Sequence, residues 1–175
     1  MYCSSATQVR PVPAKTTLVV AALLAMLSSS AAFAGTTTST FQVQVTVQAS
    51  CTIVSSPTLD FQTQGVFAAN VDRTSTLQIQ CTNTTPYDIG LNAGTGAGAT
   101  VTTRKMTSGA GATVNYSLYS NSGQTTNWGN TVGTDTVSAT GNGASQSYTV
   151  YGRVPAQTTP APAAYADTIT VTVTY

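Results

Sequence analysis

Residues 40–54, TFQVQVTVQASCTIV, alternate apolar and polar side chains without interruption, and no other feature constrains the fold as strongly. Apolar residues or Cys occupy the odd positions from Phe41 onward, and Gln, Thr or Ser fill most of the even ones. This period of two is typical of a β-strand with one buried and one solvated face. No Gly, Pro, Asn or Asp offers a turn within the stretch. We therefore expect a long amphipathic strand whose partner lies elsewhere.

The first 34 residues have the features of a secretory signal peptide. Arg10 and Lys15 precede an apolar run at 18–27, and the small-residue motif at 32–34 is a cleavage site of the A-x-A type. A membrane anchor is the alternative, but the run is shorter than the roughly 17–25 residues that span a bilayer. We expect residues 1–34 to be removed on export, which leaves a mature chain without a membrane span.

The mature chain, residues 35–175, carries little charge and two cysteines. Its few basic and acidic side chains nearly balance, so its surface has no field with which to hold nucleic acid or anionic lipid. Cys51 and Cys81 form an even pair in an exported protein, for which a disulfide is the expected state. A two-cysteine metal site is the alternative, but the chain has no His and no Glu to complete it.

Residue types that support catalysis are scarce. Without His or Glu, and with its Asp residues dispersed, the chain lacks the usual general acids and bases. A Ser–Lys pair at Lys105 is the remaining alternative for a nucleophile. The Gly-rich stretch at 94–98 lacks the third Gly of a dinucleotide loop and the Lys of a P-loop. We expect no enzymatic activity, no cofactor and no metal.

Short β-rich runs recur along the mature chain between breaks rich in Gly, Asn or Pro. No helical period occurs outside the leader. The pattern predicts an all-β fold, an antiparallel sandwich of immunoglobulin-like type. After the opening strand, the predicted strands are residues 59–61, 75–81, 87–92, 113–119, 145–154 and 167–175.

The two ends of this predicted sandwich do not balance. The last strand alternates up to Tyr175 and leaves its edge uncovered, which is an aggregation hazard. The opening strand would reach roughly 50 Å, beyond the diameter of about 35–40 Å expected for such a domain. We expect residues 40–49 to fill the open edge of another copy, which gives a head-to-tail fibre, while residues from Cys51 onward stay in the home sheet. The alternatives are self-complementation through a turn near Ser50, or an ordinary long edge strand.

Motifs along the chain resemble the spore coat U domain family, the subunits of archaic chaperone–usher (Csu-type) pili. They occur in family order and cover nearly all of the mature chain. Gln62 departs from the family pattern, which often has Gly after LDF. The matching motifs are ASCTI, LDF, LQIQCTNTTPYDIGLNAGTGA, RKMT, VNYSLYS, NWG, YTVYGRVPA and YADTITVTVTY.

This resemblance implies an incomplete immunoglobulin-like sandwich that lacks its last strand. A periplasmic chaperone lends a strand, and an outer-membrane usher exchanges it for the N-terminal extension of another subunit; strand addition of this kind is well known for pilins. The implied division is a donor-strand extension at 35–49 and a pilin domain at 50–175. The implied donor residues are Phe41, Val43, Val45 and Val47. The implied acceptor edge, also contacted by the chaperone, comprises Ile169, Val171, Val173 and Tyr175.

The expected function is therefore a structural pilus, or fimbria, subunit. It would be secreted through the periplasm of a Gram-negative bacterium to the cell surface, where the pilus supports adhesion and biofilm formation. A spore or cyst coat protein and a monomeric lectin-like surface-binding module are the alternatives. Aromatic residues on strands belong more often to a core than to a sugar-binding surface. The aromatic residues weighed for such a surface are Tyr116, Tyr119, Trp128, Tyr148 and Tyr151.

Overall fold

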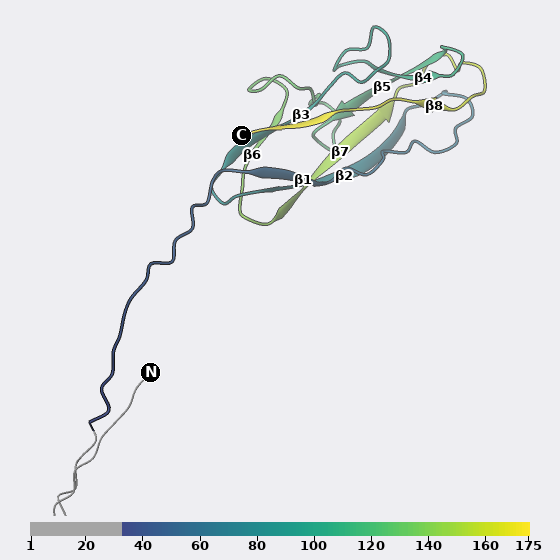
Figure 1. The fold of residues 1–175 in the computed structure, drawn as a ribbon. Helices are drawn as coiled ribbons and strands as arrows, with labels where there is room; N and C mark the ends of the chain where they lie inside the picture. The colour runs from purple at the N-terminus through teal and green to yellow at the C-terminus, as the bar shows by residue number, and fades with distance from the viewer. Residues whose placement is uncertain (1–32) are drawn as a thin grey trace, which may run out of the picture. The chain divides into compact units, whose positions relative to one another are not determined.

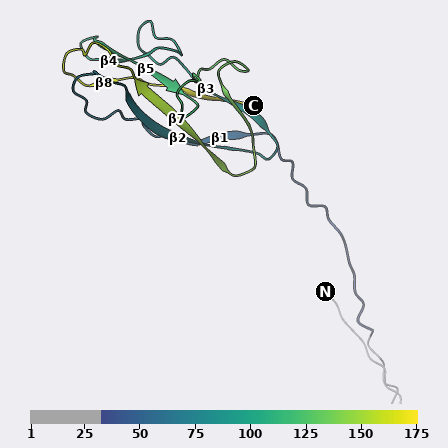
Figure 2. The same cartoon turned by 180° about the vertical axis from the view of Figure 1, so that it is seen from behind.

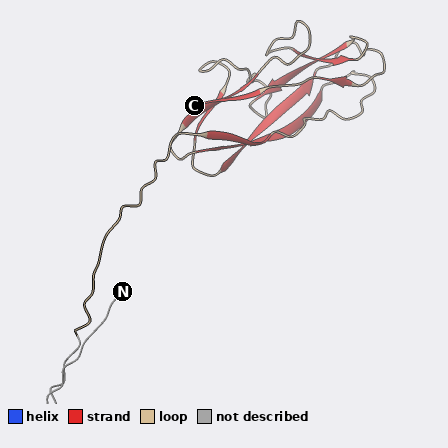
Figure 3. Cartoon of the chain, in the orientation of Figure 1, coloured by secondary structure: helices blue, strands red, loops and turns tan. Residues whose placement is uncertain are grey.

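Residues 33–175, which a computed structural model describes, form two antiparallel β-sheets and no helix (Figures 1 and 3). One sheet has six strands in the order β1-β2-β7-β5-β4-β8, and the other has three in the order β6-β3-β9. This is the predicted incomplete immunoglobulin-like sandwich. The strands are β1 (Cys51–Ser55), β2 (Val71–Cys81), β3 (Pro86–Leu91), β4 (Arg104–Ser108), β5 (Thr113–Tyr119), β6 (Val137–Thr140), β7 (Ser145–Val154), β8 (Tyr165–Ala166) and β9 (Val171–Thr174).

The predicted signal peptide at 1–34 lies outside the described residues, apart from its last two positions. Within the described part of the chain, no helix is long and apolar enough to cross a membrane. Residues 33–50 belong to no strand, so only the end of the predicted strand at 40–54 joins a sheet, as β1.

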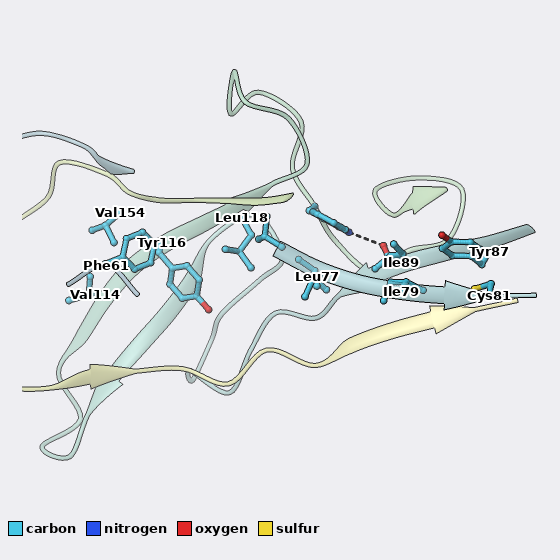
Figure 4. Packing of buried hydrophobic residues seen from close by; sticks show 13 residues of the cluster. Phe61, Leu77, Ile79, Cys81, Tyr87, Ile89, Val114, Tyr116, Leu118 and Val154 are labelled. Atoms are coloured by element: carbon cyan, nitrogen blue, oxygen red, sulfur yellow. Dashed lines mark hydrogen bonds between the residues drawn. The ribbon is translucent and has the colours of Figure 1, made fainter. Parts of the chain in front are cut away.

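The core fills the space between the two sheets with the inward-facing side chains of alternating strand positions. On β2, Leu77, Ile79 and Cys81 are buried while the residues between them are more exposed. The buried cluster continues from Tyr87 and Cys81 at one end of the sandwich to Phe61 and the residues around it at the other (Figure 4). Inside it, the Trp128 Nε1–H donates a hydrogen bond of 2.8 Å to the Ile89 carbonyl. The indole is therefore buried with its polar group satisfied.

Strand β4 was not predicted, because it begins with a charge that sequence patterns assign to the surface. Arg104 is instead fully buried. Its guanidinium donates four hydrogen bonds of 2.6–2.9 Å to backbone carbonyl oxygens. Burial lowers the pKa of Arg104. The side chain thus ties together segments that are distant in sequence. The accepting carbonyls belong to Leu91, Asn92, Val101 and Trp128.

Strand β1 is an edge strand that a disulfide joins to its neighbour. Cys51, its first residue, lies directly opposite Cys81 on β2, and the two form the expected disulfide. Beyond it, the Ser50 amide donates to Thr82 Oγ1 at 3.1 Å and the Thr82 amide donates to the Ser50 carbonyl at 2.9 Å. The N-terminal extension, residues 35–49, is therefore anchored firmly where it joins the domain.

The last predicted strand, residues 167–175, is shorter in the structure. The ladder to β3 covers only β9, and before it one backbone hydrogen bond, from the Asn92 amide to the Thr170 carbonyl at 3.2 Å, is accompanied by bonds to side chains. Asp167 Oδ1 accepts hydrogen bonds from the Thr95 and Thr168 amides at 2.7 and 2.8 Å. The Thr170 amide donates to Asn92 Oδ1 at 2.9 Å. The short strands β6 and β8 were also not predicted, since four and two residues give too little pattern.

Replacing both Cys51 and Cys81 by Ser should lower the free energy of unfolding by about 3–4 kcal/mol. The reason is that the bond closes a loop with a sequence separation of 30 residues and so restricts the unfolded chain. Urea unfolding followed by tryptophan fluorescence measures the change. Reduced wild-type protein is the control and should match the double variant. Equal midpoints for the oxidised wild type and the variant would contradict this account.

Candidate functional site

An open apolar groove of about 1070 Å³ lies in the sandwich, between residues 56–67 on one side and residues 159–169 on the other. Its floor is formed by core side chains of both sheets, so the hydrophobic core is accessible there. Monomeric proteins rarely leave such a surface uncovered unless it binds something. The apolar floor residues are Leu77, Leu91, Met106, Val114, Tyr116, Leu118, Val150, Val154 and Val171.

The groove reaches β9 at its first residue, Val171, and otherwise lies beside the stretch that precedes this strand. This strand pairs with β3 through Ile89↔Val173 and Leu91↔Val171, and among the described residues no strand pairs with its other edge. The unpaired edge of a strand offers a row of N–H and C=O groups to any extended chain that lies beside it. The site thus combines main-chain hydrogen-bonding groups with an apolar floor, which are the two requirements for adding a strand.

Leu59 and Phe61 form the opposite wall of the groove, on a segment (57–62, the wall segment) that was predicted to contain a strand but does not. Phe61 is buried and packs edge-to-face on Tyr116, with ring centroids 6.2 Å apart, and the two rings lie near Val154 and Val114 (Figure 4). The wall segment follows β1 but belongs to neither sheet, so side-chain packing and a few hydrogen bonds hold its conformation.

Gln62, the departure from the family motif, ends this wall in a left-handed conformation with φ of 62°. Its amide donates to Asp60 Oδ1 at 2.7 Å, and Arg73 Nη2 donates to Gln62 Oε1 at 3.0 Å. A left-handed backbone favours Gly, which accounts for the Gly that the family often has here. In this chain the hydrogen bonds of Gln62 offset part of the strain.

The structure divides the predicted acceptor residues between two places. Ile169 and Val171 line the groove. Val173 is half-buried opposite Ile89 and does not line it, because the core beneath this part of β9 is filled. Tyr175 is 60% exposed and borders a smaller cavity of about 420 Å³, together with residues 47–49 and 82–86.

The predicted donor residues are all exposed. Phe41, Val43, Val45 and Val47 have 86%, 84%, 87% and 76% of their surfaces accessible. The extension at 35–49 contains no charged residue. An uncharged segment with an exposed apolar face is unusual on a protein surface, and it has the pattern that an apolar groove would accept.

Tyr116 and Asp167 form a polar contact at the side of the groove. The Tyr116 hydroxyl donates to Asp167 Oδ2 at 2.7 Å, and the Thr95 hydroxyl donates to Asp167 Oδ1 at 2.8 Å. Burial, and then the hydrogen bond to this carboxylate, raise the pKa of Tyr116. These bonds hold the stretch before β9 against the loop after β3, and so fix one side of the groove.

The five aromatic residues weighed for a sugar-binding surface do not share one exposed surface, because two of them are buried. Trp128 and Tyr116 belong to the core. Tyr148 packs edge-to-face on Tyr87, with their hydroxyls 2.5 Å apart, and burial raises the pKa of Tyr148. Among the described residues, no group of three or more His, Cys, Asp or Glu is placed to hold a metal.

Comparison with protein families settles what kind of domain carries this groove. The model of the Spore Coat Protein U domain matches residues 37–172. The chain belongs to this family. The resemblance inferred from the sequence motifs is thus confirmed, and no curated protein matches the chain significantly.

A solved structure that this chain resembles is the CsuC–CsuE chaperone–tip adhesion subunit pre-assembly complex from the archaic chaperone–usher Csu pili of Acinetobacter baumannii. The similarity has a TM-score of 0.53 and a sequence identity of 30%, and it covers 74% of this chain and 40% of that chain. The Spore Coat Protein U domain protein described here thus spans less than half the length of that structural neighbour.

Stability should fall as the pH rises above about 10, in part because of Tyr116. The raised pKa keeps its hydroxyl protonated in the folded state, whereas the unfolded chain ionises near the ordinary value of 10.0 and is then favoured. Tyr116→Phe should lower the free energy of unfolding by about 1.5–3 kcal/mol at pH 8, since a hydrogen bond to a carboxylate is lost. That deficit should shrink between pH 10 and 11 in urea titrations. A constant deficit across the range would show that the pKa argument is wrong.

Proposed function

We propose that this protein is a structural subunit of an extracellular pilus, assembled by chaperone–usher donor-strand exchange. One observation carries the proposal: an open apolar groove lies beside the stretch that leads into the edge strand β9, in a chain whose N-terminal extension exposes a matching alternation of apolar side chains. The solved neighbour, a complex of a chaperone with a pilus tip adhesion subunit, supports the same mode of assembly.

The extension of one copy fits the groove of another by its pattern. Phe41, Val43, Val45 and Val47 would face the apolar floor, and the Gln and Thr residues between them would face solvent. Burial of these four side chains stabilises each joint by at most about 6–12 kcal/mol, before the entropic cost of ordering the extension is subtracted. Because the extension has no charge, the joint should be insensitive to salt.

The position of the two chain ends within the sandwich gives the donor strand a direction. The start of β1 and the C-terminus lie at the same end, where residues 47–49 and Tyr175 border one cavity, and β4 and β8 lie at the opposite end (Figures 1 and 2). In a linear fibre the incoming extension must therefore enter at the β4–β8 end and run antiparallel to β9. Such a head-to-tail contact does not close on itself and propagates.

Assembly would need the partners that protect an open groove. A periplasmic chaperone would cover β9 and the floor until an outer-membrane usher replaces its strand with the extension of the next subunit, either another copy or a related subunit. The fibre would then stand at the surface of a Gram-negative bacterium, where it supports adhesion and biofilm formation. The predicted contact residues Ile169, Val171, Val173 and Tyr175 remain part of this proposal.

Val45→Asp should abolish polymer formation while the domain still folds. A carboxylate placed against the apolar floor loses its hydration without gaining a partner. Thr46→Asp is the matched control, because it puts the same charge one residue away on the opposite, solvated face and should leave polymers intact. Electron microscopy and heat-resistant ladders on denaturing gels provide the readout. Normal fibres from Val45→Asp would contradict the donor assignment.

Deleting residues 35–49 should give a folded monomer with an empty groove. Adding a peptide of residues 36–50 should raise its melting temperature, since anything that binds the native state stabilises it by mass action. A peptide with Asp at position 45 is the control and should have no effect. Polymers formed by the deletion variant, or a wild-type chain that stays a stable monomer, would instead indicate a different use of the groove.

A further inference from the structure

We propose that Gly152 sets the depth of the groove and thereby the size of the donor side chains that it accepts. This inference rests on the proposed function and deepens it, since it assigns a positioning role to a residue that does not itself line the groove. Gly152 acts through Leu59 and Phe61, the two apolar side chains of the wall segment.

Gly152 is a buried position near the end of the long strand β7, between Val150 and Val154 of the groove floor. Its φ does not lie in the left-handed region, so the backbone itself does not require glycine there. Glycine weakens a strand interior and often marks a close approach by another part of the chain. Glycine is therefore present at this position because a neighbouring segment leaves no room for a side chain.

The space above Gly152 is taken by the wall. A Cβ built on this residue would lie 2.8 and 2.9 Å from the two Cδ atoms of Leu59, and 3.0 Å from Cζ of Phe61. These distances are shorter than ordinary van der Waals contacts. A methyl group at position 152 must consequently displace both side chains away from β7.

The wall segment can make this movement. It belongs to no strand, and its described hydrogen bonds to β2 are those from Ser75 Oγ to the Pro57 carbonyl, 2.8 Å, and from Arg73 Nη2 to Gln62 Oε1, 3.0 Å. The displaced atoms are the tips of side chains that line the groove. A larger residue at position 152 therefore makes the groove shallower, and a smaller residue at position 59 makes it deeper.

The test uses the full chain with Val45→Asp, which cannot donate its own extension, and synthetic peptides of residues 36–50. Dissociation constants are measured by calorimetry for the native peptide and for four peptides with a single Ala at position 41, 43, 45 or 47. The acceptor also carries Gly152→Ala, Leu59→Ala or both. Gly90→Ala is the matched control, because its added methyl would meet Asn130 at 3.1 Å and not the wall.

Gly152→Ala should weaken binding of the native peptide about tenfold, which is the usual scale for one misplaced methyl group in an apolar pocket. Each Ala peptide loses affinity relative to the native peptide. In the Gly152→Ala acceptor this loss should become smaller at the donor position that faces the wall and stay unchanged at the other positions. Adding Leu59→Ala should restore native binding. Leu59→Ala alone should improve binding of a peptide with Leu in place of Val at that same position, and this reading stands even if Gly152→Ala folds poorly.

Two results would overturn the inference. If Gly152→Ala weakens all five peptides by the same factor, as Gly90→Ala would through lost stability, the glycine has only a structural role. If neither Gly152→Ala nor Leu59→Ala changes which donor side-chain size binds most tightly, the wall segment does not set the depth of the groove. Binding of no peptide by the acceptor without further substitutions would instead overturn the proposed function, and this inference with it.

Discussion

The structure depends on one constraint, an open core beside the stretch that leads into the edge strand β9. An immunoglobulin-like sandwich buries its inner faces only when the last strand covers the seam between the sheets. Here β9 pairs with β3 alone among the described residues, and side chains of both sheets line the groove beside it. In the proposed function the missing cover comes from another chain, and the N-terminal extension has the period and the apolar face that such a cover requires.

A domain with an exposed core needs other means of holding its sheets together. The disulfide between Cys51 and Cys81 fixes the edge strand β1 to β2 at the end where the core is filled. Arg104 provides a second support. Its guanidinium is fully buried and donates hydrogen bonds to four backbone carbonyl oxygens, so removing the side chain would leave these oxygens buried without partners. Both lie outside the groove lining, so the domain can keep its fold while the groove is empty.

The groove itself is held more loosely. On one side, Asp167 binds the stretch before β9 to Thr95 and Tyr116. On the other, the wall segment has no ladder and rests on β7 at Gly152. In the proposed joint, β9 would present main-chain groups for register, whereas Leu59 would limit the size of the side chain that enters. On this proposal, one side of the groove would contribute backbone pairing and the other would select side-chain volume.

The sequence alone determined the all-β class, the strand β7 with its bounds and the pairing of Cys51 with Cys81, because each depends on a local period or on residue type. Tertiary structure alone decided the rest. β4 was missed because the burial of Arg104 depends on carbonyls from distant segments. Leu59 and Phe61 belong to a wall and not to a strand, since their neighbour in space is Gly152, which is 91 positions beyond Phe61 in the sequence. A pattern of residues shows which face is apolar, but only the assembled sheets show which apolar face has been left without a cover.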